Sequence, residues 1–284
     1  MNSLKLVQHI NSLTDISDIM NAMKYLSIME SNKLSRYIQH QKRAMRSIEL
    51  AADDFLHFHP ELLSKSKPKS HIIVVIGSER GFCGNYNEVL YQKVQRNSEV
   101  ENSNLQTTII TIGYKLHNKF EQHSQSHKAL SGPRLVEEIP EIISELVASI
   151  DTKLDDQHEV QLTVLYHLES KPEPQFQKVL PAFQNFDSNQ VTYKTPPLTY
   201  LSNTALFYSL VDEYLFAMLN QIFYSAFMSE NQYRIRHMDN SLNKLTEKIS
   251  GLSLKRNEYR QEEITEELEV IMLSANIIES DVEV

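Results

Sequence analysis

The residues best suited to chemistry lie in a loop from Gly77 to Asn87, which follows an apolar run and precedes a predicted helix. Loops in this position often bind ligands in α/β proteins. The glycine spacing fits neither G-x-x-x-x-G-K-[ST] nor G-x-G-x-x-G, so the sequence does not predict a phosphate-binding loop. Cys83 is the only cysteine, which excludes an intramolecular disulfide and a Cys-rich zinc site. It is a candidate nucleophile, but a structural turn is the favoured interpretation because no catalytic partner stands out.

Two histidine pairs and one acidic cluster are the other candidates for chemistry. His57 and His59 lie two residues apart, whereas His123 and His127 lie four apart and could bind a metal from one helix face. Among 11 histidines such pairs arise by chance, so we predict no metal and no cofactor. The acidic cluster is more typical of a solvated or partner-facing helix surface than of acid–base catalysis. It comprises Glu262, Glu263, Glu266, Glu267 and Glu269. We therefore expect a chain without an active site of its own.

Composition narrows the class of protein further. The 284 residues are 41% hydrophobic and 23% charged, which is typical of a folded protein with a real core. The net charge of −9 argues against a nucleic-acid-binding protein. No apolar run reaches the roughly 18 residues that span a bilayer, and the N-terminus does not resemble a signal peptide. The chain is expected to be cytosolic, or held at a membrane only through partners.

Glycine and proline divide the chain into three segments. Neither residue occurs from 1 to 59, and from 198 to 284 the only one is Gly251. Helix interiors exclude proline and disfavour glycine, whereas turns require both. The sequence therefore predicts an N-terminal helix over 1–59, a turn-rich segment over 70–197 and a C-terminal helix over 205–278.

The two terminal segments carry apolar residues at helical spacing. In the first, the stripe comprises Val7, Ile10, Leu13, Ile16, Met20 and Met23. In the last, residues stepping by three and four form a heptad seam of Ile235, Met238, Leu242, Leu245, Ile249 and Leu252, which becomes polar at Arg256. Two helices of an ordinary bundle would explain both patterns. Their length and their position at opposite ends of the chain favour a long antiparallel two-helix coiled coil.

The middle segment alternates strand and helix patterns. Continuous β-branched runs at 71–77, 107–113 and 160–166 predict buried strands, with helices at 87–97 and 136–150 between them. A weaker strand is predicted at 190–195, and the polar stretch 98–106 is predicted to be a loop. Buried strands separated by helices are typical of a parallel sheet. The predicted fold is therefore α/β, with a Rossmann-like domain inserted between the coiled-coil helices.

Three separated motifs carry a resemblance to a known family. The first is Ile19 to Lys24, followed by Ser31 and Lys33, which is similar to I-T-x-A-M-K with a downstream S-K. The second is Ser78 to Gly84 with Asn87, similar to S-D-R-G-L-C-G-x-x-N. The third runs from Ser229 to Glu269 and includes Glu230, Asn231, Arg234, Met238, Asn257, Arg260, Gln261, Ile264, Thr265, Glu267 and Leu268. In this order and spacing they resemble the gamma subunit of F-type ATP synthases, the central rotor shaft.

The resemblance implies a rotor function without bond chemistry. In that family the coiled coil lies inside a ring of three alpha and three beta subunits, and the α/β domain meets the epsilon subunit and the membrane ring of c subunits. The chain would couple ion-driven rotation of the c-ring to conformational change in the alpha/beta hexamer, in contact with the membrane only through the complex. The location implied is the cytoplasmic face of the bacterial inner membrane.

The resemblance also assigns roles to individual residues. Arg260 and Gln261 would contact a loop of a beta subunit and form an angle-specific attachment, which we call the catch, because a guanidinium can bind a carboxylate bidentately. The same coupling region would include Thr265, Glu267, Met23, Lys24 and, lower on the shaft, Arg234. The motif turn, expected to shape the α/β domain, comprises Glu79, Arg80, Gly81, Cys83 and Gly84, with Glu79 a candidate to pair with a basic group.

Departures from the family pattern suggest a divergent branch, such as an alternate ATPase complex. Glu79 replaces the family's Asp, Thr195 replaces a Glu before Pro196, and acidic residues continue to Glu283 where the family ends in small apolar ones. Two other functions stay open at this point. A free coiled-coil scaffold or adaptor would lack the rotary role, and an enzyme using Cys83 would act without partners.

Overall fold

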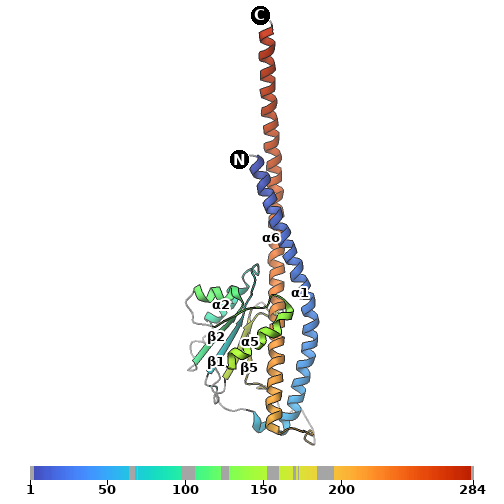
Figure 1. Cartoon of the computed structure of the whole chain (residues 1–284), viewed down its shortest axis with the longest axis vertical. Coiled ribbons are helices and arrows are strands. Elements are labelled where there is room, and N and C mark those ends of the chain that lie inside the picture. The colour runs from blue at the N-terminus through green and yellow to red at the C-terminus, as the bar shows by residue number, and fades with distance from the viewer. Residues whose placement is uncertain are drawn as a thin grey trace. The chain divides into compact units, whose positions relative to one another are not determined.

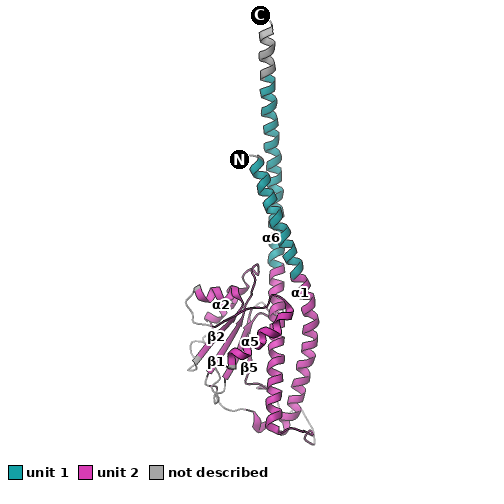
Figure 2. Cartoon of the chain, in the orientation of Figure 1, with its two compact units in different colours: residues 1–26, 236–284 teal, residues 27–235 magenta. Residues whose placement is uncertain are grey.

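The computed structural model describes residues 3–63, 68, 70–96, 106–122, 128–151, 160–168, 171, 173–183 and 195–282. The chain forms two compact units (Figure 2): unit 1 comprises residues 1–26 and 236–284, and unit 2 comprises residues 27–235. The boundary therefore cuts both terminal helices rather than following the ends of the segment predicted to be α/β. In the described residues no helix is long and apolar enough to cross a membrane.

Figure 1 labels the main elements along the chain. The N-terminal helix is α1 (Ser3–Phe58) and the C-terminal helix is α6 (Asn203–Val282). Between them lie η1 (Pro60–Leu62), β1 (Ser70–Ile76), α2 (Tyr86–Arg96), β2 (Gln106–Ile112), α4 (Tyr114–Gln122), β3 (Lys128–Leu130), η2 (Val136–Glu138), α5 (Ile139–Asp151), β4 (Val160–Tyr166) and β5 (Gln175–Leu180).

Unit 2 contains a five-stranded sheet of order β3-β2-β1-β4-β5. The first four strands are parallel, as predicted, but β5 runs antiparallel to β4. The elements α4, β3 and β5 were not predicted from the sequence. The weak strand predicted at 190–195 and the loop predicted at 98–106 lie almost wholly outside the described residues.

Each face of this sheet has its own core. Alternate residues of β1 face opposite sides, so Ile72 and Val74 pack in one cluster whereas Ile73 and Val75 pack in the other. The first cluster includes residues of α5 and α6, and the second includes residues of α2 and α4. Because both faces are covered, the strands read as continuous apolar runs without alternation.

The buried positions of α1 repeat every seven residues. In unit 1 they include Leu6, Ile10, Leu13 and Met20, and in unit 2 the same three- and four-residue steps continue through Leu34, Met45 and Ala52. The predicted stripe was wrong at two positions, because Val7 is 38% exposed and Ile16 is 46% exposed. Leu6 and the half-buried Ser17 hold the places predicted for these two residues.

In unit 1 the two helices pair through a small apolar cluster. Met20 and Met23 of α1 pack with Met238 and Leu242 of α6, and the Lys24 ammonium lies 2.8 Å from the Asp239 carboxylate. The predicted heptad seam of α6 is the least exposed stripe up to Arg256, and from residue 257 to 272 every side chain is exposed. The antiparallel coiled coil is therefore present, but the described part of the chain does not cover the apolar residues of α6 between 257 and 272.

Candidate functional site

Three loops meet at the carboxyl edge of the parallel strands in unit 2. Gly77, directly after β1, donates its N–H to the Ile112 carbonyl at 2.8 Å, and Lys115 donates its N–H to the Ser78 carbonyl at 3.1 Å. Gly113, directly after β2, has a φ of 99° and lies so close to Ser78 that a Cβ would be 2.8 Å from the Ser78 carbonyl oxygen. Only glycine fits this close approach without strain.

Glu79 binds the three loops together. Its Oε2 accepts the N–H of Gly132 at 2.9 Å and the N–H of Tyr114 at 3.0 Å, and its Oε1 lies 3.3 Å from Nη2 of Arg134. Burial alone would raise the pKa of Glu79, but the two N–H groups and Arg134 outweigh it and hold the pKa below its usual value. The basic partner expected for Glu79 from the sequence is thus Arg134, which no motif identified.

Hydrogen bonds between residues of the motif itself hold the rest of the motif turn in place. Asn87 accepts the N–H of Ser78 at 2.9 Å and donates to the Ser78 hydroxyl at 2.7 Å, so the last residue of the motif fixes its first. The Cys83 thiol is buried and donates to the carbonyls of Arg80 and Gly81. Burial, together with the nearby Glu230 charge, raises the pKa of Cys83 to about 12. A buried thiol with a raised pKa is protonated at neutral pH, which favours the structural interpretation of Cys83.

Arg234 of α6 connects the second and third sequence motifs. Its guanidinium binds the Glu230 carboxylate one turn earlier, donates to Asn231 Oδ1 at 2.9 Å, and donates through Nε to the Gly81 carbonyl at 3.3 Å. Arg234 is 5% exposed and Glu230 is 3% exposed. Burial raises the pKa of Glu230 to about 7 against the opposing charge of Arg234. The predicted coupling residue Arg234 is thus engaged inside unit 2.

Aromatic side chains gather near the ends of β1 and β4, where the strand order reverses. Open α/β sheets usually bind their ligands at this point. Here His167, directly after β4, lies 4.3 Å from the Tyr86 ring and 5.2 Å from the Tyr233 ring of α6, measured between centroids. The Tyr86 hydroxyl donates to the Ala226 carbonyl of α6 at 3.2 Å. The usual ligand position is therefore occupied by a contact with the C-terminal helix.

The predicted catch residues, unlike Arg234, lie on an exposed stretch of α6. Arg260, Gln261, Thr265 and Glu267 are all exposed, and the Thr265 hydroxyl donates to the Gln261 carbonyl one turn earlier at 2.8 Å. Met23 and Lys24 were expected to face this region from the other helix. Lys24 instead pairs with Asp239, which precedes Arg260 by 21 residues, or about 30 Å along the helix.

The histidine candidates do not form a metal site in the part of the chain that the structure describes. His59 Nδ1 lies 3.2 Å from Glu61 Oε1, whereas His57 packs its ring edge-on against Phe58. No three His, Cys, Asp or Glu side chains gather among the described residues. The pair His123 and His127 lies outside them.

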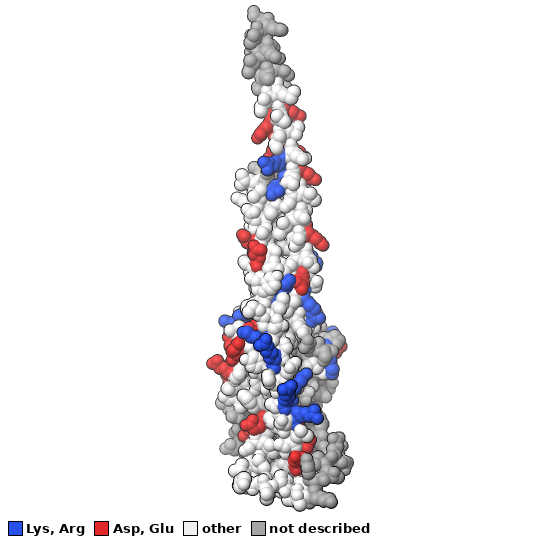
Figure 3. Space-filling model, turned by 90° about the vertical axis from the view of Figure 1, so that its right-hand side faces the viewer, with Lys and Arg blue, Asp and Glu red and all other residues white. Residues whose placement is uncertain are grey.

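A basic face on α1 was not singled out from the sequence. Between residues 31 and 48 this helix carries five Lys or Arg and no Asp or Glu, although the whole chain has a net charge of −9. All five are exposed, and Figure 3 shows Lys and Arg side chains gathered on one face. One of them, Lys33, also binds Glu30 and Glu137. The basic face comprises Lys33, Arg36, Lys42, Arg43 and Arg46.

Comparisons with known proteins agree over nearly the whole chain. A family profile described as ATP synthase matches residues 2–277. An ATP synthase gamma chain of Fusobacterium nucleatum is 25% identical over 287 residues, which cover 95% of this chain and 96% of that relative. A gamma chain of Ruminococcus albus is 29% identical over 220 residues, which cover 75% of each chain.

Solved structures show the same fold. A chain of the Euglena gracilis mitochondrial ATP synthase, described as OSCP/F1/c-ring in rotational state 3, has a TM-score of 0.66 and 17% identity, with 99% of this chain and 96% of that chain covered. A rotor chain of the same enzyme in rotational state 1 has a TM-score of 0.63 and 15% identity, with coverage of 92% and 98%.

Proposed function

The chain belongs to the ATP synthase family, among the gamma chains of its central stalk, and we propose that it couples rotation of a membrane c-ring to the alpha/beta catalytic hexamer. In this function it binds three alpha and three beta chains, and its α/β domain meets an epsilon chain and the c-ring. It performs no bond chemistry and touches the membrane only through the complex, at the cytoplasmic face of a bacterial inner membrane. A free scaffold is not favoured, because the family match spans residues 2–277.

One observation carries this proposal: α6 is a single uninterrupted helix that contributes to both units. Its residues 203–235 belong to unit 2, where Tyr86 and Arg234 attach it to the α/β domain, and its residues 236–282 belong to unit 1. A continuous helix resists twisting because every turn is hydrogen-bonded to the next. It can therefore transmit torque from a domain that is fixed to one part of it.

The surfaces of the two helices suit different partners. The five cations of the α1 basic face would be attracted to acidic surfaces of neighbouring subunits. Beyond Arg256, α6 exposes Ile264, Leu268 and Ile271, which need an apolar partner or a second chain to cover them. A ring of alpha and beta chains supplies such cover in the proposed complex.

Arg260 and Gln261 form the catch in this proposal. Both side chains are exposed, so they are available to a partner. An Arg260 guanidinium that binds a beta carboxylate at one shaft angle and not at the others gives each angle a different contact energy. Only such a difference in contact energy can shift the conformation of a catalytic site.

The first experiment is co-expression of this chain with the alpha and beta chains encoded beside it, followed by size exclusion and an ATPase assay. We expect a complex of three alpha, three beta and one of this chain that hydrolyses ATP. If this chain elutes alone while alpha and beta assemble normally without it, the rotor function is wrong.

The catch is tested in the complete membrane enzyme with Arg260→Ala and Gln261→Ala combined. Loss of a charge-assisted bond should lower ion-driven ATP synthesis by up to about tenfold, while the free chain stays equally stable. The matched control is Lys255→Ala, an exposed cation on the same helix that points about 140° away. Equal synthesis rates in the double variant, the control and the unaltered enzyme would refute the catch.

A further inference from the structure

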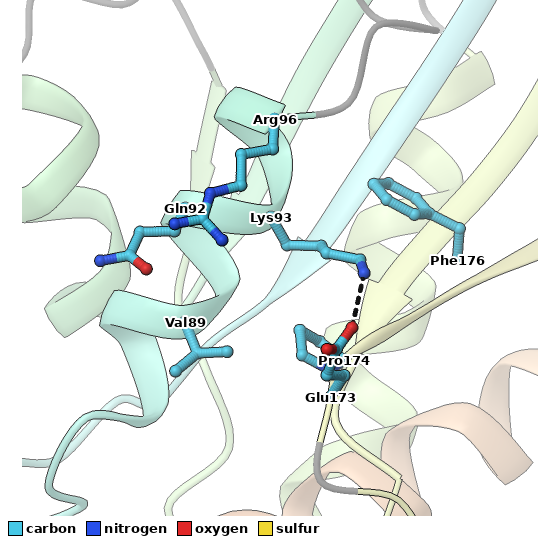
Figure 4. Close-up of a pocket in the computed structure, with 7 residues that line it drawn as sticks. All are labelled: Val89, Gln92, Lys93, Arg96, Glu173, Pro174 and Phe176. Carbon is cyan, nitrogen blue, oxygen red and sulfur yellow. Dashed lines mark hydrogen bonds and ion pairs between the residues drawn. The ribbon is translucent and has the colours of Figure 1, made fainter.

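A cavity of about 360 Å³ lies in unit 2 between α2 and the beginning of β5, away from the loops described above. Figure 4 shows Val89 on the helix, with Pro174 and Phe176 opposite it. These three apolar side chains line a hollow at the last strand of the sheet, whose order ends at β5. The volume is in the range of small-molecule sites, near its lower end.

The polar lining of this cavity carries an excess of positive charge. Lys93 and Arg96 lie three residues apart on α2 and therefore share a helix face. Lys93 reaches across the opening to Glu173, with 2.9 Å between its Nζ and the Glu173 carboxylate (Figure 4). Glu173 can balance only one of the two cations. Arg96 is exposed and leaves a net positive charge beside the apolar surface.

Together these groups match a ligand with a flat ring and an anionic group. Phe176 is partly buried and offers a ring to stack on, and aromatic stacking binds any base without regard to sequence. Arg96 is suited to a phosphate because its planar guanidinium binds two oxygens at once. Lys93 can move from Glu173 to the same phosphate. Gln92 donates its Nε2 to Glu88 at 2.9 Å, which leaves its carbonyl oxygen to accept a bond from an exocyclic amine.

We propose that this cavity binds a mononucleotide, with the phosphate on Arg96 and Lys93 and the base on Phe176. A bound mononucleotide would link α2 to β5 and change how rigidly the edge strand is held. The proposal does not depend on the rotor function, because binding at this cavity needs no other subunit.

Equilibrium dialysis of radiolabelled AMP against the purified full chain tests the proposal. Arg96→Ala should weaken AMP binding about tenfold through loss of a charged hydrogen bond, and Phe176→Ala should do so through loss of stacking. Glu173→Gln should have the opposite effect and tighten binding several-fold, because it removes the carboxylate that competes for Lys93. Lys178→Ala, an exposed cation on the same strand outside the cavity, should leave binding unchanged.

Three outcomes would overturn the proposal. The first is no AMP binding at millimolar concentration. The second is inorganic phosphate binding as tightly as AMP, since Phe176 would then contribute nothing. The third is an equal effect of Lys178→Ala and Arg96→Ala, which would indicate unspecific charge attraction, with Lys93 and Arg96 merely balancing the negative end of the α2 dipole.

The assembled complex gives an independent measurement. Photolabelling with 8-azido-AMP, followed by proteolysis and mass spectrometry, should label the peptide that contains Phe176. Excess AMP should abolish the label. Because this readout is the labelled peptide and not ATP turnover, a complex that assembles and hydrolyses ATP but shows no label here would overturn this proposal and leave the rotor function standing.

Discussion

Arg234 and Arg260 lie on the same helix and belong to the same sequence motif, yet their surroundings are opposite. Arg234 is buried in unit 2 and binds a carboxylate, an amide and a backbone carbonyl. Arg260 is exposed in unit 1 and lies in a stretch where every side chain faces outwards. One arginine therefore stabilises the fold of this chain, whereas the other is free to act on a partner.

This contrast shows why a motif alone does not assign a role. The residues of the third motif lie at helical spacing along α6. Among the described residues, only those in unit 2 contact the α/β domain. Separating a buried ion pair is costly, because it leaves a buried charge without compensation. The pair therefore holds its helix in one orientation. An exposed arginine contributes little to stability and gains its effect only when a second chain approaches.

The largest predicted effect is that of Arg234→Ala. The Glu230 carboxylate would lose its cation while 3% exposed, which typically costs about 3 to 5 kcal/mol. We expect the melting temperature to fall and the amides of the Gly77–Tyr86 loop to exchange faster, because the bond to Gly81 is lost as well. Chemical denaturation and hydrogen exchange of the full chain measure both effects.

Two further variants sharpen this test. Arg260→Ala removes the same side chain from an exposed position and should change the unfolding free energy by less than about 0.5 kcal/mol. Glu230→Gln in the Arg234→Ala background should recover part of the loss above about pH 7, where the buried Glu230 would otherwise have to ionise without its cation. If Arg234→Ala and Arg260→Ala were equally mild, the buried network would have no stabilising role and the comparison would fail.

The second effect concerns Glu79, whose carboxylate binds loops within unit 2. Glu79→Gln should destabilise the chain by about 1 to 2 kcal/mol at neutral pH, because hydrogen bonds to a charged group are stronger than those to a neutral one. The pKa of Glu79 is lowered in the folded state, so its contribution is complete above the ordinary value of 4.5 and is lost as the pH falls below it.

Denaturation of both proteins from pH 7 to pH 3 measures this dependence. The difference between the unaltered chain and the Glu79→Gln variant should shrink towards zero at the acidic end. A difference that is the same at every pH would mean that shape, and not charge, is what Glu79 contributes.

Much of the fold was predictable from the sequence because it depends on local patterns. The near absence of glycine and proline from the terminal segments, with Gly251 the one exception, predicted α1 and α6 within a few residues. Three β-branched runs predicted β1, β2 and β4. The sequence did not predict β3 and β5. The strand β3 (Lys128–Leu130) is only three residues long, and β5 (Gln175–Leu180) mixes polar with apolar residues at the edge of the sheet. Edge strands carry a weaker apolar signal than central ones.

The site was predictable only in part, because its geometry depends on distant segments. The motif turn was identified from Glu79 to Gly84, but two residues that bind in or beside it belong to no motif. Arg134, which binds Glu79, and His167, whose ring bonds to the Tyr86 carbonyl, follow other strands. Proximity of strand ends could have indicated them, since the carboxyl ends of parallel strands share one edge. The error in the predicted apolar stripe of α1, where Ser17 is half-buried in place of Ile16, has a different cause. Ser17 and Lys24 lie on the buried stripe although neither is apolar, so hydrophobicity alone selected the wrong register.

The smallest predicted effect concerns Gly251, the only glycine in α6. It is exposed, and a Cβ built there would meet no atom within 4 Å, so Gly251→Ala should stabilise the helix by up to about 1 kcal/mol. Slower hydrogen exchange around residue 251 and a higher melting temperature would agree with this. Coupling should also be unchanged, because the proposed catch needs only the exposed Arg260 nine residues further on. If the stabilised variant loses ATP synthesis, then α6 must flex at Gly251 during rotation, and the exposed end of the helix is more than a rigid support for Arg260.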